Sequence, residues 1–335
     1  MSGAARIGLG RRGSVAGLLL LLLALAVSLW PTSARAQQSH WHGDYFPNVT
    51  LTDQSGRRLR FYDDMIRGKV VAINFIYTEC TSVCPLDTAQ LKRVHQILGD
   101  RVGRDIFFYS ISINPGHDTP ATLTRFMRTY DIGPNSGWRF LTGSRADVEL
   151  LQRRLGIAAP DPDDLSGHDT SFLLGNEATG QWIKRSSFEN PQNIANILGE
   201  TLNNYASTVR GDAGPRQNYA AAGHVTDTSQ GIYLFRTRCA SCHTIGEGDR
   251  LGPDLRGVAG SRDPAWLMRW IQQPDQMIAA RDPIAMGLMA RYRNLPMPNL
   301  RINAQDAQAL IDYLRAQDAQ HAPAPANRPP RAAAH

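Results

Sequence analysis

The four cysteines of this chain lie in two tight pairs, and this arrangement constrains the fold more than any other feature of the sequence. Cys80 and Cys84 form the first pair, and Cys239 and Cys242 form the second. Four cysteines in 335 residues are too few for a small domain held together by disulfides. A chain of this length is long enough for two ordinary domains. The sequence therefore predicts two domains, each with one cysteine pair.

The second pair belongs to the motif Cys239-Ala-Ser-Cys242-His243, which is the attachment motif for a c-type haem. Two thiols at this spacing reach the two vinyl groups of one porphyrin and form thioethers, and the adjacent histidine then ligates the iron. A chain of this composition would contain the motif by chance roughly once in a thousand cases. The alternative is a small disulfide loop beside a surface histidine. The motif predicts one covalently bound haem c, with His243 as an axial ligand.

A second axial ligand is expected downstream of His243. A methionine sulfur in this position favours electron transfer, because it raises the potential of the iron. Met297 lies between Pro296 and Pro298, and the two prolines stiffen the loop that must hold the ligand in place. We therefore predict that Met297 is the second axial ligand. Core packing is the expectation for the other downstream methionines, Met277, Met286 and Met289.

Residues 226–317 resemble a class I cytochrome c domain. The family pattern GxxxFxxxCxxCH begins here at Gly231, and the segment LGPDL at 251–255 matches the one that follows the haem histidine. The resemblance implies that the carbonyl of Pro253 accepts a hydrogen bond from His243, which orients the imidazole ring. It also implies that Gly231 lets the first helix of this domain approach the last one closely.

The first pair, Cys80 and Cys84, stands between a predicted strand at 69–78 and a predicted helix at 85–98. The strand is an almost continuous run of β-branched and aromatic residues, which is typical of a strand buried on both faces. The CxxxC spacing alone is a weak signal, because chance produces it in roughly one such chain in twenty. Its position at a helix N-terminus is expected to lower the thiol pKa. Two thiolates suit a soft metal such as Cu(I), and they leave room for an imidazole as third ligand.

The histidines available as a third ligand in this part of the chain are His40, His42, His95, His117 and His168. His95 lies within the predicted helix and is expected to be a solvated surface residue. A capping or surface role is expected for His117, and disorder near the N-terminus is expected for His40 and His42. His168 lies in a Gly- and Asp-rich loop just before a predicted strand. From there it can return across the sheet towards the cysteines.

The hydrophobic pattern predicts two different fold classes along the chain. In the first region, further strands are predicted at 106–113, 171–174 and 181–184, and further helices at 120–130, 144–155 and 191–202. The second region has helical patterns at 228–238, 264–273 and 304–316 and lacks a strong strand pattern. We therefore predict an α/β domain followed by a small all-α domain.

Residues 44–202 resemble the Sco/SenC family of thioredoxin-fold copper proteins. The resemblance rests on VVAINFIYTECTSVCP at 70–85, SISINPGHDTPATL at 110–123 and GHDTSFLL at 167–174. It implies an α/β thioredoxin-like fold and one copper ion held by Cys80, Cys84 and His168. The chain departs from the family at two positions, because Asn114 and Gly167 stand where the family commonly has Asp. The change at Gly167 removes a carboxylate next to the copper histidine, but it removes no ligand.

The N-terminus has the three-part layout of a secretory signal peptide. Arg6, Arg11 and Arg12 precede an apolar run at 15–30, and Ala34-Arg35-Ala36 provides a cleavage signal. We interpret residues 1–36 as a signal peptide that is cleaved after Ala36. An uncleaved membrane anchor is the alternative, because the apolar run approaches the length of a spanning helix. The mature protein is therefore expected in the periplasm.

The basic composition of the chain comes largely from this N-terminal segment. The formal net charge is +6, but residues 1–36 contain four arginines and no acid, so the remaining chain carries +2. The mature chain contains no block rich in Lys and Arg, which argues against nucleic acid as a partner. Composition predicts a linker at 206–225 and a disordered tail at 319–335. With the two resemblances, this implies a copper domain at 40–205 and a cytochrome c domain at 226–318.

Together, the two resemblances imply an exported assembly factor that binds copper and carries a fused electron-transfer domain. The implied target is the binuclear copper site in subunit II of a haem–copper cytochrome oxidase. The implied partners are that subunit or its assembly factors, and a respiratory electron donor or acceptor. The alternative is a thiol–disulfide reductase in which Cys80 and Cys84 form the redox pair and the haem relays electrons. A metallochaperone and electron carrier is favoured over an enzyme, and no catalytic residue is predicted beyond this redox pair.

Overall fold

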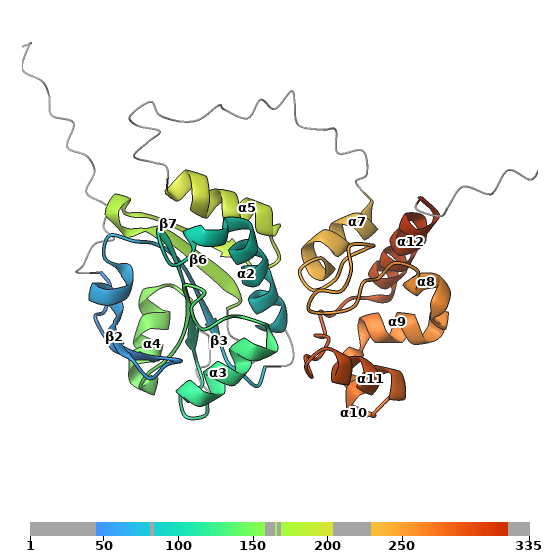
Figure 1. The fold of residues 1–335 in the computed structure, drawn as a ribbon, viewed down its shortest axis with the longest axis horizontal. Helices are drawn as coiled ribbons and strands as arrows, with labels where there is room; N and C mark the ends of the chain where they lie inside the picture. Colours follow the sequence, from blue (N-terminus) through green and yellow to red (C-terminus); the bar gives the residue numbers. More distant parts are fainter. Residues whose placement is uncertain (1–44, 81–83, 158–164, 166–168, 204–228, 321–335) are drawn as a thin grey trace, which may run out of the picture. The chain divides into compact units, whose positions relative to one another are not determined.

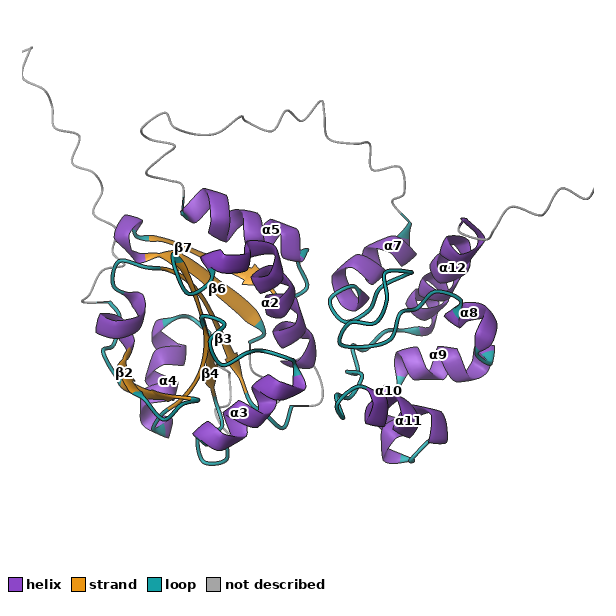
Figure 2. Cartoon of the chain, in the orientation of Figure 1, coloured by secondary structure: helices purple, strands orange, loops and turns teal. Residues whose placement is uncertain are grey.

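The computed structural model describes residues 45–80, 84–157, 165, 169–203 and 229–320 of the chain (Figure 1). The predicted signal peptide, the predicted linker and residues 321–335 of the predicted tail lie outside the described residues. The described residues form two folded regions, one before and one after residues 204–228. The first region combines strands and helices, whereas the second is built from helices (Figure 2). The predicted fold class, an α/β domain followed by a small all-α domain, is confirmed.

A seven-stranded sheet forms the centre of the first region, in the order β2-β1-β5-β4-β3-β6-β7. The strands are β1 (Thr50–Asp53), β2 (Arg58–Arg60), β3 (Val70–Ile76), β4 (Ile106–Ser112), β5 (Trp138–Thr142), β6 (Ser171–Asn176) and β7 (Gln181–Ser186). The central strands β3, β4 and β5 run parallel to one another. β6 runs antiparallel to β3, and β1 runs antiparallel to β5. The start of β6 therefore lies at the same edge of the sheet as the ends of β3 and β4.

The central strand β3 is buried along its whole length. Successive side chains of a strand point to opposite faces of the sheet, so β3 contributes to two cores. One core receives Val70, Ala72 and Ile76. The other receives Val71, Ile73 and Phe75. This double burial explains why the sequence of β3 is a continuous apolar run rather than an alternating one.

Helices cover both faces of the sheet. The first core also contains residues of α2 (Cys84–Leu98), α3 (Pro120–Thr129) and α5 (Pro191–Asn196), and the second contains residues of α4 (Arg145–Arg154). Helix α5 continues into a π-helical turn, Ile197–Leu202. The hydroxyl of Thr119 accepts a hydrogen bond from the N–H of Thr122 at the start of α3. Thr119 therefore caps the N-terminus of this helix.

The second region contains six α-helices within the described residues. They are α7 (Gln230–Leu234), α8 (Val258–Ser261), α9 (Pro264–Gln272), α10 (Pro274–Ala279), α11 (Pro283–Arg291) and α12 (Ala304–Gln320). Helices α7 and α12 approach very closely at Gly231. A Cβ atom built on this glycine would lie 2.3 Å from the carbonyl oxygen of Ala309 and 2.6 Å from Cβ of Tyr313. The packing role predicted for Gly231 is confirmed.

The sequence pattern locates the long elements, but it does not locate several short ones. The structure adds β1, β2 and β5 to the first region and α8, α10 and α11 to the second. β1, β2, β5 and α8 have five residues or fewer, which is too short for a hydrophobic period to stand out. Helix α12 ends at Gln320, so residues 319–320 belong to this helix and not to the predicted tail.

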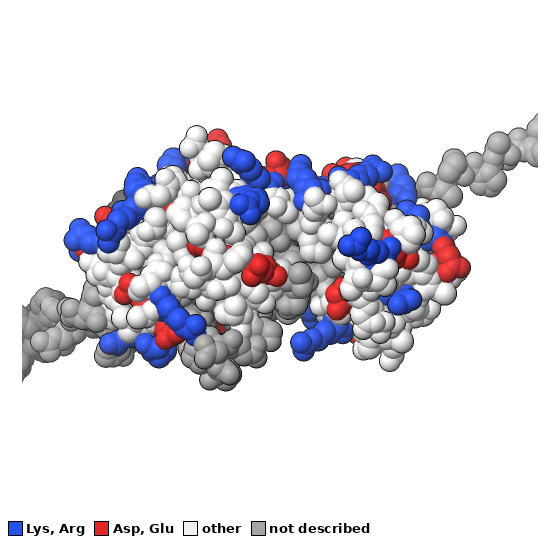
Figure 3. Space-filling model, turned by 90° about the horizontal axis from the view of Figure 1, so that it is seen from below, with Lys and Arg blue, Asp and Glu red and all other residues white. Residues whose placement is uncertain are grey.

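Charged side chains of both signs are mixed on the molecular surface. On the face shown in Figure 3, Lys and Arg lie among Asp and Glu, as expected for a chain whose charges nearly balance outside the N-terminal segment. Among the helices of the described residues, none combines the length and the apolar character needed to cross a membrane.

Candidate functional site

Cys80 and Cys84 lie together at the carboxyl end of β3. Cys80 stands in the loop that follows β3, and Cys84 is the first residue of α2. Both side chains are buried, with exposed fractions of 6% for Cys80 and 0% for Cys84. The Cys84 thiol forms a hydrogen bond with the sulfur of Cys80. The structure therefore brings the first predicted pair into direct contact.

The pKa of Cys84 is raised far above its ordinary value, so the expected lowering at the helix N-terminus is wrong. The hydrogen bond with Cys80 is the largest cause, followed by burial and by the negative charges of Cys80 and Asp87. Removing the last proton of the pair would leave two adjacent negative sulfurs in a place that water does not reach. A cation bound to both sulfurs would remove this cost. The pair is therefore suited to exchange a proton for a soft metal ion.

The loop that holds Cys80 is fixed by the buried carboxylate of Asp118. This carboxylate accepts hydrogen bonds from the N–H and the hydroxyl of Thr78, at 3.1 and 2.5 Å. It also accepts one from the hydroxyl of Ser112, at 2.6 Å. Ser112 is the last residue of β4, and Thr78 follows β3. Asp118 thus joins the carboxyl ends of two neighbouring strands directly beside the cysteine pair.

His117 lies at the solvent side of this network. Its Nδ1 is 3.1 Å from Oδ1 of Asp118, and its Nε2 is 3.2 Å from Oε1 of Glu79. The side chain is 44% exposed, which agrees with the expected surface position. The cap of helix α3 is Thr119 and not His117. The imidazole instead connects the turn after β4 to the residue that precedes Cys80.

A buried carboxyl group, Asp87, lies in the first turn of α2 and was not identified from the sequence. Its exposed fraction is 1%, and its Oδ1 atom has no hydrogen-bond partner among the described residues. Burial raises the pKa of Asp87 well above its ordinary value, and the negative charges of Cys80 and Asp169 raise it further. The nearby Ser187 hydroxyl acts in the opposite direction but does not outweigh these effects. In the sequence, this site is marked only by an acidic residue three positions after Cys84.

The predicted third ligand, His168, lies outside the described residues. The next described residue, Asp169, forms an ion pair with Lys184 and accepts a hydrogen bond from the N–H of Ser171 at 2.8 Å. Ser171 begins β6, and β6 starts at the edge of the sheet where β3 ends. Within the described part of the chain, no group of three or more His, Cys, Asp or Glu side chains is placed to hold a metal ion.

His95 is the other histidine of the first region within the described residues, and it belongs to no group of side chains placed to hold a metal ion. His95 is half-buried, and its Nε2 lies 2.7 Å from the carbonyl oxygen of Ser136. The expectation of a fully solvated His95 is therefore wrong. Its ring also lies close to Trp138, with ring centroids 6.3 Å apart. His40 and His42 lie outside the described residues.

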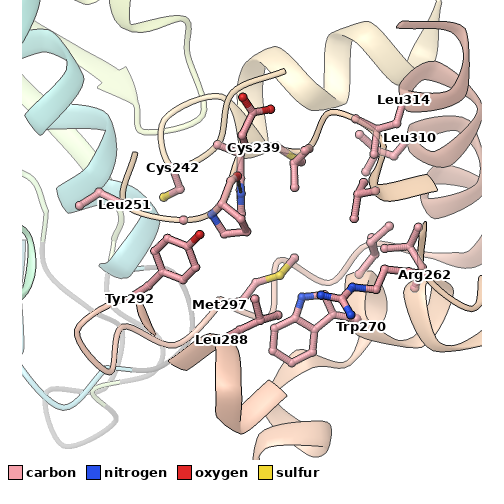
Figure 4. Close-up of a pocket in the computed structure, with 18 of the residues that line it drawn as sticks. Cys239, Cys242, Leu251, Arg262, Trp270, Leu288, Tyr292, Met297, Leu310 and Leu314 are labelled. Carbon is pink, nitrogen blue, oxygen red and sulfur yellow. Dashed lines mark hydrogen bonds between the residues drawn. The ribbon is translucent and has the colours of Figure 1, made fainter. Parts of the chain in front are cut away.

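The second region encloses a cavity of about 290 Å³ around the second cysteine pair. Cys239, Cys242 and His243 line this cavity, and so does Met297 from the segment between α11 and α12. In Figure 4, Cys239 and Cys242 lie on one side of the cavity, and Met297 lies on the other with Trp270. Burial raises the pKa of Cys239 to about 12, so this thiol is protonated at neutral pH. A mostly apolar cavity with two thiols, an imidazole and a thioether at its walls fits a haem c.

The imidazole of His243 is fixed in position by its surroundings. Its Nδ1 lies 2.8 Å from the carbonyl oxygen of Pro253, so Nδ1 carries the proton and donates it to this acceptor. A Cβ atom built on Gly252 would lie 2.6 Å from Cε1 of His243, so a glycine is needed there. Burial lowers the pKa of His243, against the opposing effects of Pro253 and Asp249. The ring is therefore neutral, with the lone pair of Nε2 available to a metal.

The four downstream methionines take three different positions. Met277 is 3% exposed and belongs to a core cluster, as predicted. Met286 is 40% exposed, so the expectation of core packing is wrong for this residue. Met289 lines the cavity, as does Met297. The structure thus brings two thioethers to the cavity wall where the sequence analysis expected one.

Other residues of the cavity wall were not identified from the sequence. Trp270 stacks on Trp266 with ring centroids 5.4 Å apart, and the guanidinium of Arg262 lies 5.8 Å from the centroid of the Trp266 ring. The hydroxyl of Tyr292 donates a hydrogen bond to Asp249 at 2.7 Å. Burial and this hydrogen bond raise the pKa of Tyr292 to about 12. These residues come from segments that are distant in sequence, and no local motif marks them.

Comparisons with known proteins assign a family resemblance to each region. The sequence profile of the SCO1/SenC family matches residues 36–203, which is half of the chain. The profile of cytochrome c matches residues 229–318. Both cysteine pairs fall within these matches, as do His168, His243 and Met297.

Individual relatives resemble one region or the other. The SCO1 protein homolog of Bacillus subtilis is 29% identical over 129 residues, which cover 37% of this chain and 65% of that protein, just under two thirds. The structure of Bradyrhizobium japonicum ScoI with copper bound is 24% identical, with a TM-score of 0.39, and the match covers 46% of this chain and 97% of that one. The cytochrome c domain of the pp3183 protein from Pseudomonas putida is 47% identical, with a TM-score of 0.25, over 27% of this chain and 89% of that one.

Proposed function

Because the chain belongs to the SCO1/SenC family and continues into a cytochrome c region, we propose that it is an exported copper-binding assembly factor with a fused haem c domain. Its target is the binuclear copper site of a haem–copper cytochrome oxidase, to which it delivers copper or whose copper it reduces. The observation that carries the proposal is the buried, hydrogen-bonded pair of Cys80 and Cys84 at the carboxyl end of β3.

Copper is the cargo of the first region. Cys80 and Cys84 offer two sulfurs, and thiolate sulfur is a preferred ligand of Cu(I). The protons of the two thiols must leave when both sulfurs bind the metal, so copper loading becomes more favourable as the pH rises. His168 is the proposed third ligand, supported by the family resemblance and by the start of β6 at the same sheet edge.

The residues that line the cavity of the second region are suited to hold a haem. Cys239 and Cys242 would form its covalent attachments, and Nε2 of His243 would be one axial ligand. Met297 would be the other axial ligand, with Met289 also at the cavity wall. A bound haem supplies one-electron transfer at a potential that its axial ligands set. Pro253 and Gly252 hold the imidazole of His243 in the required orientation.

The copper proposal is tested by metal and haem stoichiometry of the purified, full mature chain. We expect one copper and one haem per chain. The Cys80→Ser, Cys84→Ser and His168→Ala variants should each lose copper and keep the haem. His95→Ala is the matched control, because His95 is a histidine of the same region whose Nε2 faces the carbonyl of Ser136. Copper content that is unchanged by all three ligand variants would reject the proposal.

A thiol–disulfide reductase remains the alternative, because the two sulfurs already contact each other as a disulfide-forming pair must. In this reaction the Cys80–Cys84 dithiol gives two electrons and two protons to a target disulfide. A disulfide forms between Cys80 and Cys84, and the target becomes a dithiol. The two functions differ in their need for His168. Full reductase activity of His168→Ala, together with loss of copper, would favour the alternative, whereas weak activity of every form would exclude it.

Export to the periplasm by residues 1–36 is part of the same proposal. It is supported by the basic, apolar and small-residue parts of this segment. Cleavage after Ala36 gives a mature chain that begins at Gln37, and N-terminal sequencing of protein from the periplasmic fraction measures this directly. Full-length protein in the membrane fraction would instead indicate an uncleaved anchor.

A further inference from the structure

A groove with an accessible volume of about 840 Å³ lies in the first region, away from the cysteine pair. Its walls include Arg57 from the turn between β1 and β2, Arg104 before β4, Arg128 from α3 and Arg139 from β5. Among the described residues that line it, the only acidic side chain is Asp100. Four arginines in the wall of one groove are a marked excess of positive charge in a chain whose charges otherwise nearly balance.

The carboxylates around the groove do not neutralise these arginines. Asp53 is fully buried and is shared by Arg139 at 2.7 Å and Arg57 at 3.7 Å. Burial raises the pKa of Asp53, but hydrogen bonds from Ser55 and Arg57 and the charge of Arg139 outweigh this and lower it overall. Asp53 is therefore ionised at neutral pH, and it still compensates only one of the two guanidinium groups beside it.

The positive charges of the other two groove arginines, Arg104 and Arg128, are neutralised even less by nearby carboxylates. Asp105 is shared between Arg104 at 3.4 Å and Arg101 at 3.1 Å. Arg128 is exposed, and no carboxylate of the described residues lies within ion-pair distance of it. Arg57 and Arg104 are also largely exposed, with exposed fractions of 56% and 68%. Three guanidinium groups are thus available to an incoming anion.

The effect of the excess positive charge extends to a neighbouring residue. The pKa of Lys69 is lowered, with burial as the largest cause. The charges of Arg139 and Arg57 lower it further, whereas Asp64 acts in the opposite direction. The part of this lowering that comes from the two groove arginines indicates a positive potential at Lys69, in agreement with the arginines that line the groove.

The groove lies at the opposite end of the sheet from the cysteine pair. Gly103 and Gly137, which precede β4 and β5, both line it. Their backbones touch, since a Cβ atom built on Gly137 would lie 2.5 Å from Cα of Gly103. Because β3, β4 and β5 are parallel, the amino ends of β4 and β5 lie at one edge and the loop with Cys80 lies at the other. A ligand in the groove therefore does not cover the sheet edge at which the thiols lie.

We propose that this arginine groove binds an acidic, carboxylate-bearing segment of a protein partner. Arginine receives carboxylates in a planar, two-point geometry, and several in one hollow fit an extended acidic segment better than a single small ion. A membrane surface fits less well, because the arginines line a recess. In addition, the large apolar side chains that are exposed among the described residues, Tyr233, Ile284 and Met286, all lie in the second region. This inference goes beyond the proposed copper function and does not depend on it.

The test measures binding of a fluorescent hexaglutamate peptide to the full mature chain by fluorescence anisotropy. We expect binding that weakens as the ionic strength rises from about 0.01 M to about 0.15 M, because screening shortens the range of the charges. Arg128→Ala should weaken it at least about threefold and Arg104→Ala/Arg128→Ala about tenfold, as loss of charged partners predicts. Arg125→Ala is the matched control, since Arg125 is exposed on the same helix but does not line the groove.

Three results would overturn the proposal. The first is no binding at low ionic strength, and the second is equal weakening by the groove variants and by Arg125→Ala. The third is that vesicles of phosphatidylethanolamine and phosphatidylglycerol bind more tightly than the peptide and lose binding in the same variants, which would assign the groove to a lipid surface. A hexaglutamine peptide should not bind in any case. Copper and haem content should stay unchanged in all these variants, which separates this test from that of the copper function.

Discussion

The carboxylate of Asp118 receives both the backbone N–H and the hydroxyl of Thr78, and it does so without any exposure to solvent. This contact fixes the loop that leaves β3 two residues before Cys80. Because Ser112 donates to the same carboxylate, the loop is tied to the end of β4 as well. The position of Cys80 therefore depends on a group that binds no ligand itself.

Asp118→Asn should destabilise the protein and disturb the thiol pair. The NH2 group of asparagine cannot accept a hydrogen bond, so it would face the N–H or a hydroxyl group that now donates to the carboxylate. A buried donor that loses its acceptor in this way costs about 1–3 kcal/mol of folding stability. Urea denaturation followed by circular dichroism measures the change. Asp131→Asn is the control, since Asp131 is 66% exposed in its pair with Lys92 and should change stability by less than about 1 kcal/mol. Equal effects of both changes would contradict the role assigned to Asp118.

Asp87→Asn should stabilise the metal-free protein at high pH. The pKa of Asp87 is raised in the folded state, so protonation favours folding. The stability that this group contributes is fully present below its unfolded pKa and is lost as the pH rises through its folded pKa. Asparagine cannot ionise and avoids that loss. We expect a gain of about 1 kcal/mol or more at pH 8 that shrinks towards pH 4, from urea denaturation at several pH values. A gain that does not depend on pH would contradict this cause.

Gly231→Ala should destabilise the second region. The new methyl group would lie 2.3 Å from the carbonyl oxygen of Ala309, so α7 and α12 would have to move apart. Overpacking of this kind costs about 1–3 kcal/mol. Thermal unfolding followed at the haem absorbance measures it. Gly260→Ala is the matched control, because a Cβ atom there would meet no atom within 4 Å. Equal unfolding temperatures of the two variants would contradict the close packing of α7 against α12 at Gly231.

Met297→Leu and Met289→Leu distinguish the two thioethers at the cavity wall. We expect Met297→Leu to abolish the absorption band of methionine-ligated ferric haem and to lower the reduction potential. Met289→Leu should preserve the band, because leucine and methionine are similar in size and packing. Spectroscopy and redox titration of both variants measure these properties. If only Met289→Leu loses the band, Met289 and not Met297 is the ligand of the iron.

Local sequence predicted the features that depend on spacing within one segment. The cysteine pairs, the strand β3 and the helix α2 are all of this kind. The role of Gly231 and the contact between His243 and Pro253 also followed, because both resemble a known sequence pattern. In each case the physical constraint acts between residues that are close in sequence or recur at fixed positions in a family.

The features that sequence did not predict depend on contacts between distant segments. Asp87 looks like an ordinary acid in a helix until the fold places it beside Cys80 and Asp169. The lowered pKa expected for Cys84 followed from its helix position alone, and the neighbouring sulfur and burial reversed it. The arginine groove collects residues from four segments, so no single segment is rich in positive charge.

The helices that surround the cavity of the second region have a further consequence for the life of the protein in the cell. Helices α9 and α11, which both contribute residues to the cavity wall, each begin with a proline and have only nine residues. Helices this short are marginal without tertiary support, and much of that support would come from a group that fills the cavity between them. Under the proposed haem attachment, chains that fail to mature would be open to proteolysis. The cellular abundance of this protein would then report how well the cell supplies haem.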